Sequence, residues 1–290
     1  MNAPTLEETS FYKALKLAEG AVSILDVGGK CFTRVWCAYE CFISLTQIDG
    51  LKYEVYTALE HDSKNYTTMN NSHPRSAVGI VDGLGKSVGN QDTGDDVDED
   101  TQDKAFRERY FPVALAQEAF ALKLETAQAS VETDRIKILN TIAEQTEDLA
   151  AEPLATHPRY DALNALLRGR FAVVALRGLL DAGKSIEQAA ALVKGCARRK
   201  LELCFDGVEA FDANAMHLIA QNLPPTLEEL DMARGGLTAD HLPALTSALS
   251  DPASKLTTLK CVPPLCPPLP ASILAFWLSD FPGLVTVSSH

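Results

Sequence analysis

Three short segments in the last third of the chain repeat one pattern of alternating leucines. The segments are RKLELCF (199–205), TLEELDM (226–232) and KLTTLKC (255–261). When Leu203, Leu230 and Leu259 are aligned, they are separated by 27 and 29 residues. Stretches with helical periodicity lie between the segments, at 212–223 and 238–249. A strand followed by a helix at a nearly constant period predicts a stacked array in which neighbouring units bury the leucines between them.

This strand–helix period resembles that of leucine-rich repeats of the ribonuclease-inhibitor type, and we assign 199–290 to such a region. A proline-rich break at 263–270 is followed by two apolar runs, 273–281 and 284–287, which we expect to form a degenerate terminal cap. The outward-pointing strand positions predict a protein-binding face on the concave surface of the array. Its residues are Glu202, Glu229, Asp231, Thr258 and Lys260.

The charge of the chain limits its partners. The formal net charge is −13 over 290 residues, and such a field repels nucleic acid and anionic lipid, so we expect neither as a partner.

The N-terminus has no basic start and no apolar core, and the most apolar run, 171–176, is too short to cross a bilayer. Seven cysteines without regular spacing are typical of a reducing compartment. We therefore expect a cytoplasmic protein.

Residues 1–150 read as a mixed α/β module. Helical spacing at 11–19 and 33–46 alternates with strand-like runs at 21–27, 51–59 and 76–84. An amphipathic helix is predicted at 132–145. Two prolines at 151–158 then interrupt the pattern, and we assign 151–198 to a helical linker region.

The segment 85–104 is nearly devoid of apolar residues, so we expect a disordered acidic loop. Asp96, Asp98 and Asp100 imitate the start of a calcium-binding loop. The match fails because Thr101 replaces the required glycine and Arg107 replaces the final glutamate. Cys31, Cys37 and Cys41 have no histidine within local reach and match no zinc spacing. We expect no metal site and interpret these cysteines as buried free thiols.

The segment GLLDAGKS (178–185) fits the phosphate-binding pattern G-x-x-x-x-G-K-[ST]. If FAVVAL (171–176) forms a strand before it, then Lys184 would contact phosphates and Ser185 would contact magnesium. The same residues also fit one long helical face that ends at Gly183. The bulky Leu179 and Leu180 favour this second interpretation, a helix–turn–helix, over nucleotide binding.

Residues 33–42, TRVWCAYECF, contain the most specific motif of the first half. Arg34, Trp36, Cys37 and Glu40 fit the pattern R-x-W-C-x-x-E, which resembles the signature of Toll/interleukin-receptor (TIR)-like domains in large algal and protist proteins. AQASVETDRIKILNTI (127–142) is similar to the segment that ends the same group of domains. The resemblance covers about 10–145, and such domains are often fused to repeats.

The TIR resemblance implies a specific chemistry for Glu40. In TIR domains that cleave NAD, the glutamate of this motif is catalytic, and NAD would then be a substrate; no other cofactor is implied. A complete TIR domain places two strands with their helices before the motif, whereas only one helix and one strand precede Thr33 here. The missing elements favour the other interpretation, in which Glu40 is the polar edge of a packed helix. Arg34, Trp36 and Cys37 are then residues of the motif and the core.

Together these patterns predict an α/β protein. We expect a partial TIR-like (flavodoxin-like) module, then a helical linker region, then a short leucine-rich-repeat solenoid. The favoured function is a non-enzymatic scaffold for protein–protein interaction, related to signalling, with a protein partner that the sequence does not name. TIR-like modules associate with each other, so the resemblance also implies self-association. The alternatives are NAD hydrolysis by Glu40 and nucleotide binding by Lys184 and Ser185.

Overall fold

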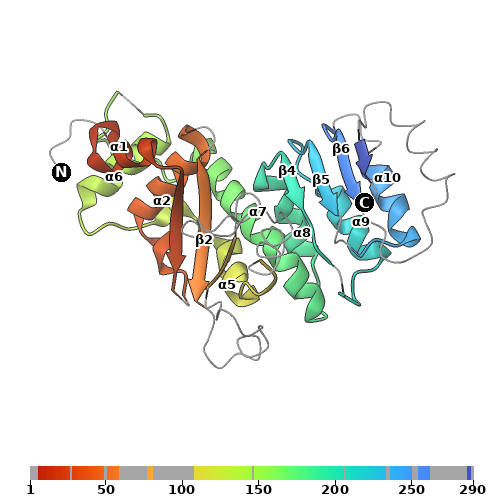
Figure 1. Cartoon of the computed structure of the whole chain (residues 1–290). Coiled ribbons are helices and arrows are strands. Elements are labelled where there is room, and N and C mark those ends of the chain that lie inside the picture. The colour runs from red at the N-terminus through yellow and green to blue at the C-terminus, as the bar shows by residue number, and fades with distance from the viewer. Residues whose placement is uncertain are drawn as a thin grey trace, which may run out of the picture. The chain divides into compact units, whose positions relative to one another are not determined.

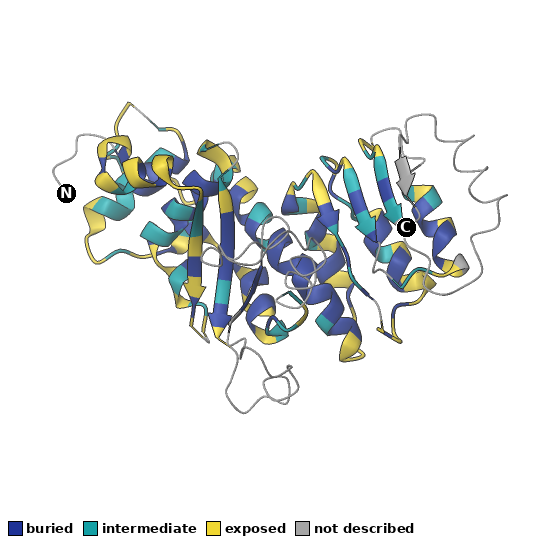
Figure 2. Ribbon diagram, in the orientation of Figure 1, coloured by how far each residue is buried: buried dark blue, intermediate teal, exposed yellow. Residues whose placement is uncertain are grey.

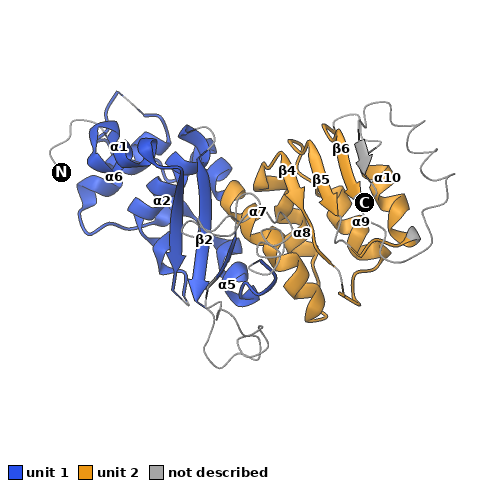
Figure 3. Cartoon of the chain, in the orientation of Figure 1, with its two compact units in different colours: residues 1–164 blue, residues 165–290 orange. Residues whose placement is uncertain are grey.

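The computed structural model describes ten ranges of the chain, which divide into two compact units. The described residues are 6–26, 28–48, 51–58, 77–80, 108–145, 147–205, 207–232, 236–249, 254–261 and 286–288. The units comprise residues 1–164 and 165–290 (Figure 3). The acidic segment 85–104 and the run 273–281 lie outside the described residues. Both units combine helices with a small sheet, so the α/β class predicted from the sequence is confirmed.

The first unit contains a three-stranded sheet of order β1-β2-β3 (Figure 1). β1 (Gly20–Leu25) pairs in parallel with β2 (Lys52–Ala58), and β3 (Ala77–Ile80) pairs antiparallel with β2. The parallel pair requires a crossover connection, which α2 (Val35–Phe42) provides together with a π-helical turn at Ile43–Gln47. This turn continues α2, as expected from the apolar spacing over 33–46.

Helix α2 packs against α6 (Glu132–Ile142), and its Cys41 Sγ lies 2.9 Å from the Tyr53 hydroxyl of β2. The sheet face toward α2 carries Ser23, Leu25, Tyr53 and Val55, which are all buried. Short helical segments complete this unit. They are η1 (Leu6–Glu8), α1 (Ser10–Leu17), η2 (Lys30–Thr33), α5 (Val113–Glu118), η4 (Ala119–Ala121) and η5 (Leu124–Thr126). Thr9 sets the start of α1, because its hydroxyl accepts a hydrogen bond from the Tyr12 N–H at 3.2 Å.

The second unit contains four parallel strands in the order β4-β5-β6-β7. They are β4 (Lys200–Glu202), β5 (Glu229–Met232), β6 (Thr258–Cys261) and β7 (Thr286–Ser288). Helices alternate with the strands, namely α8 (Glu187–Val193), η6 (Lys194–Cys196), α9 (Ala213–Gln221), η7 (Ala239–His241) and α10 (Leu242–Leu249). α9 contacts both α8 and α10. The three strands and two helices predicted from the repeat are therefore present.

The register of the repeat differs from the alignment chosen on the sequence. Leu201, not Leu203, pairs with Leu230, and Leu230 pairs with Leu259, so both intervals are 29 residues. Leu201 and Leu203 point to the same side of the strand, so burial alone does not choose between them. The backbone fixes the choice, because the Arg199 carbonyl accepts hydrogen bonds from both the Glu228 and Glu229 N–H groups.

Helix α7 (Pro158–Asp181) is the longest described element, and the boundary between the units falls within it. Its part in the second unit packs very closely on the turn that follows α8. A Cβ added to Gly169 would lie 2.4 Å from the Cys196 nitrogen, and one added to Gly195 would lie 2.8 Å from the Ala165 oxygen. Glycine at both positions therefore permits this contact.

Burial alternates along the strands of the repeat sheet (Figure 2). Leu201, Leu230 and Leu259 are fully buried, whereas the strand positions immediately before and after each of these leucines are half-buried or exposed. The buried side chains of the neighbouring helices include Ala190, Met216, Ile219 and Leu245. In the part of the chain that the structure describes, no helix has both the length and the hydropathy needed to span a bilayer.

Candidate functional site

The outer positions of β4, β5 and β6 form two rows of polar side chains across the sheet. One row follows the register Lys200–Glu229–Thr258, and the other follows Glu202–Asp231–Lys260. We call these six residues the charged strand face. It contains all five residues predicted for the protein-binding face, because parallel pairing at a 29-residue interval brings equivalent positions side by side.

Lys200 also belongs to this face, although it was not among the residues predicted from the sequence. It precedes Glu202 by two residues and so shares its side of the strand, and only the alignment of Leu203 with Leu230 concealed its place in the row. With Leu201 aligned instead, Lys200 falls opposite Glu229. The repeat interval was thus the signal that would have identified it.

Glu229 is the centre of an ion-pair network on this face. Its Oε1 atom lies 2.8 Å from the Lys200 Nζ and 2.9 Å from the Lys260 Nζ. Lys260 Nζ also lies 4.0 Å from Asp231 Oδ2. Burial acts to raise the pKa of Glu229, but hydrogen bonds from both lysines outweigh it and lower the pKa below its ordinary value. The same contact raises the pKa of Lys260. The network therefore fixes charged groups from three strands in one arrangement.

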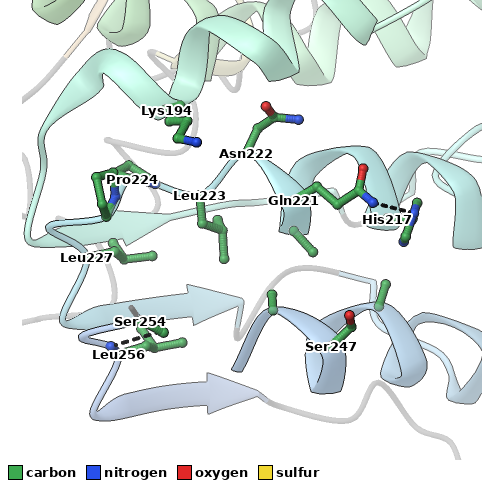
Figure 4. A pocket seen from close by; sticks show the side chains of 14 residues that line it. Lys194, His217, Gln221, Asn222, Leu223, Pro224, Leu227, Ser247, Ser254 and Leu256 are labelled. Atoms are coloured by element: carbon green, nitrogen blue, oxygen red, sulfur yellow. Dashed lines mark hydrogen bonds between the residues drawn. The ribbon is translucent and has the colours of Figure 1, made fainter. Parts of the chain in front are cut away.

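The second unit also contains a pocket of about 610 Å³, which the residues of the charged strand face do not line (Figure 4). It is lined by the end of α9, the turn before β5, part of α10 and residues near the start of β6. Its polar lining includes Lys194, His217, Asn222 and Ser247, and the His217 Nε2 atom lies 2.8 Å from the Gln221 Nε2. None of the residues predicted from the sequence lines it. Its walls come from separate repeats, so no local motif could have indicated it.

The two segments that carry the TIR resemblance meet in the first unit. The Val35 N–H donates to the Gln128 carbonyl at 2.9 Å, and the Gln128 N–H donates to the Thr33 carbonyl at 2.8 Å. These bonds form an isolated parallel bridge between Arg34 and Gln128. Residues 33–42 and 127–142 are thus joined at the beginning of α2, and α2 and α6 pack together beyond the bridge.

The motif residues occupy different environments on α2. Trp36 is half-buried and meets the ring of the fully buried Tyr39 edge-on, with ring centroids 6.1 Å apart. Arg34 is exposed, and Cys37 and Glu40 are half-buried. Burial raises the pKa of Glu40 above its ordinary value, and the nearby charge of Arg34 opposes this shift. Trp36, Cys37 and Glu40 therefore share one helix, which Arg34 precedes as its N-cap. Tyr39 rather than Trp36 lies at the centre of the core.

The sheet of the first unit differs from a flavodoxin-like arrangement. Such sheets are mostly parallel, whereas β3 is antiparallel to β2, with Val55 opposite Ile80. The strands expected at 21–27, 51–59 and 76–84 correspond to β1, β2 and β3, but their directions could not be read from local patterns.

Lys184 and Ser185 follow the end of a helix. FAVVAL (171–176) lies inside α7, so the strand that a phosphate-binding loop requires is not formed there. The Lys184 N–H donates to the Leu179 carbonyl at 2.8 Å and the Gly183 N–H to the Leu180 carbonyl at 2.9 Å. With a φ of +60° at Gly183, this is a Schellman helix end. The Ser185 hydroxyl is hydrogen-bonded to the Glu187 carboxylate.

The three cysteines near α2 also differ in environment. Cys41 is buried and its Sγ lies 2.9 Å from the Tyr53 hydroxyl, whereas Cys31 and Cys37 are only half-buried. The expectation of buried thiols therefore holds for Cys41 alone. Among the described residues, no group of three or more Cys, His, Asp and Glu side chains is arranged to hold a metal ion. The calcium-like segment 96–107 lies outside the described residues.

Comparison with known proteins adds no further assignment. No protein-family model, curated protein or solved structure matches the chain.

Proposed function

We propose that the chain is a non-enzymatic scaffold related to signalling. In this proposal the second unit is a short leucine-rich-repeat array that binds a protein partner through the charged strand face. The observation that carries the proposal is the alignment of six polar side chains from β4, β5 and β6 on one side of a parallel sheet. The opposite side is fully buried at Leu201, Leu230 and Leu259. Extended strand surfaces of this kind suit protein ligands.

The rigidity of the network supports this role. Two lysines hold the Glu229 carboxylate within 2.9 Å, so this part of the face is ordered before a partner arrives. Pre-ordered side chains lose less conformational entropy on binding. The face also presents carboxylate and ammonium groups in a fixed order, which favours a partner with the complementary order of charges.

The test is affinity capture of cellular partners by the whole chain, followed by cross-linking with an amine-reactive reagent. We expect cross-links to the partner at Lys200 and Lys260. A variant with Glu229→Lys and Asp231→Lys should lose that partner. The control, with Glu187→Lys and Glu209→Lys, changes the charge equally at exposed positions away from the face and should retain it. Equal capture of that partner by both variants, measured below the melting transition of each, would refute the assignment.

We further infer that the first unit is a shortened TIR-like module. The support is the junction of the two resembling segments through Val35 and Gln128. Self-association is the role that this module would contribute. β1 pairs only with β2 among the described strands, and it exposes Val22 and Ile24 on one side. An edge strand with exposed apolar side chains is a surface on which a second copy can pair.

We place the scaffold in the cytoplasm. Cys31, Cys37, Cys41, Cys196 and Cys204 are all free thiols. Free thiols persist in a reducing compartment.

A further inference from the structure

The pocket of the second unit is formed where neighbouring repeats meet (Figure 4). Its lining comes from Lys194 in η6, the end of α9, the turn before β5, part of α10 and the turn before β6. Its volume of about 610 Å³ is typical of sites for small molecules. The pocket shares no lining residue with the charged strand face, so a ligand here would not occupy that face.

Two leucines at equivalent repeat positions provide much of the apolar surface of the pocket. Leu227 and Leu256 stand two residues before Glu229 and Thr258, which pair in register on β5 and β6. The corresponding position of the preceding repeat holds Arg198, so the leucine pair belongs to this one junction. Alanines of α9 and α10 line the pocket with short side chains. Because Leu256 is only half-buried, an apolar ligand would remove more of its surface from water.

Hydrogen bonds between repeats hold both leucines in place. The Thr226 hydroxyl donates to the Arg198 carbonyl, and the Thr257 hydroxyl donates to the Glu228 carbonyl, each at 3.2 Å. Each threonine is adjacent in sequence to one of the two leucines, so each turn is tied to the repeat before it. A pocket whose walls are already ordered loses little conformational entropy when a ligand binds.

The charge of the pocket is opposite in sign to that of the whole chain. Its titratable lining residues are Lys194 and His217, and no aspartate or glutamate is among the described residues that line it. Within the part of the chain that the structure describes, Lys194 forms no ion pair. The chain contains 39 acidic and 26 basic residues, but salt screens their field beyond about 10 Å. The lysine at the pocket therefore acts most strongly on a bound ligand.

Helix α9 ends at the pocket, and free carbonyl groups at a helix end disfavour an anion. Asn222 occupies two of these carbonyls. Its Nδ2 donates to the Leu218 carbonyl at 2.8 Å, and its backbone N–H donates to the Ile219 carbonyl at 3.0 Å. These bonds reduce the negative character of the helix end, so the ammonium group of Lys194 remains the dominant charge.

We propose that this pocket binds a small organic anion, namely a carboxylate on a compact apolar body. The apolar body packs on Leu227 and Leu256, and the carboxylate accepts a charge-assisted hydrogen bond from Lys194. Such a ligand contacts segments of neighbouring repeats at once. Because it binds the folded array and not the unfolded chain, it also stabilises the second unit.

The experiment compares three probes that share one apolar body and differ in charge. They are the anion naphthoate, the neutral naphthamide and the cation naphthylmethylamine, each titrated into the full-length chain by calorimetry at neutral pH. We expect saturable one-to-one binding of naphthoate. Naphthamide should bind at least about tenfold more weakly, because hydrogen bonds to charged groups are the stronger ones. The amine should bind most weakly of the three.

Substitutions separate the charge of the pocket from its shape. Lys194→Met keeps an apolar side chain and removes the charge, so the affinity for naphthoate should fall to that for naphthamide, which should not change. Ser247→Trp places a large ring in the pocket from an exposed position of α10 and should weaken both probes. Lys184→Met and Asn214→Trp are the matched controls, because both positions are exposed in the same unit but do not line the pocket. They should leave both affinities unchanged.

A measurement on the unmodified chain locates the ligand without any variant. At a naphthoate concentration about ten times its Kd, acetic anhydride should modify Lys194 about tenfold more slowly than without the ligand, because few sites remain empty. The modification of Lys184 should not change. The proposal is overturned if no probe binds at millimolar concentration, or if naphthamide or the amine binds as tightly as naphthoate. It is also overturned if naphthoate binding survives Ser247→Trp, or if Lys194 is not protected.

Discussion

The carboxylate of Glu229 lies 2.8 Å from the ammonium group of Lys200, its register partner on the neighbouring strand. Lys260, on the strand at the other side, approaches the same oxygen at 2.9 Å. One acidic residue thus connects three strands that are 29 residues apart in sequence. Because these ion pairs link neighbouring strands, the charged residues of the proposed binding face also contribute to the stability of the repeat sheet.

Replacing Glu229 by glutamine should lower the free energy of unfolding by about 1 kcal/mol at pH 7, because cross-strand charge pairs contribute a few tenths to one kcal/mol each. The folded state lowers the pKa of Glu229, so its contribution is present above the ordinary carboxyl pKa of 4.5 and is lost as the pH falls below that value. Denaturation with urea at pH 7 and pH 3 measures this difference.

The control for that experiment is Glu228→Gln. Glu228 is a neighbour in sequence, but its ion pair with Arg199 is longer, at 3.7 Å, and more exposed. This substitution should change stability by less than about 0.5 kcal/mol. Equal losses in the two variants, or a loss in Glu229→Gln that persists at pH 3, would show that the network does not stabilise the sheet.

Gly183 should be necessary as the helix end, and Lys184 should not act as a phosphate ligand. Gly183→Ala forces a side chain into the left-handed region at φ +60° and should cost about 1 kcal/mol, whereas Lys184→Ala should be nearly neutral. Thermal melting measures both. Addition of ATP and magnesium should leave the melting temperature of the unmodified chain unchanged. A rise that Lys184→Ala abolishes would instead establish nucleotide binding.

Glu40 should not support turnover of NAD. The full-length chain, assayed at high protein concentration to favour self-assembly, should leave NAD unconsumed. Burial raises the pKa of Glu40, so its charge opposes folding above pH 4.5 and stability increases as the pH falls through the raised value. Glu40→Gln should therefore be at least as stable as the unmodified chain at pH 7. NAD consumption that disappears in a folded Glu40→Gln variant would restore the enzymatic alternative.

The repeat region could be predicted from the sequence because its signals are local. Alternating leucines mark β4, β5 and β6, and Asp212 caps α9 by accepting a hydrogen bond from the Ala215 N–H at 2.8 Å. The register could not be predicted in the same way, since a shift of two residues from Leu201 to Leu203 keeps both side chains on the buried face. Only the pairing of distant backbone groups decides between them.

The rest of the chain shows where local signals end. FAVVAL (171–176) is compatible with a buried strand or a buried helix, and the length of α7 decides for the helix. The antiparallel direction of β3 depends on how the chain returns to β2, which no residue pattern encodes. The contact between Val35 and Gln128 likewise arises from tertiary packing. The motif at 33–42 was visible in the sequence, but its environment was not.

Self-association through β1 provides the last prediction. Ile24 is 77% exposed and Val22 is 48% exposed on this edge strand. A lysine at position 24 would place a charge within the apolar surface and should weaken association at least about tenfold, equivalent to about 1.4 kcal/mol. Sedimentation equilibrium over a range of concentrations measures the change. Val131→Lys is the control, because Val131 is 52% exposed in the same unit but lies beside α6. A mass that is independent of concentration in the unmodified chain, or equal weakening by both variants, would exclude β1 as the contact.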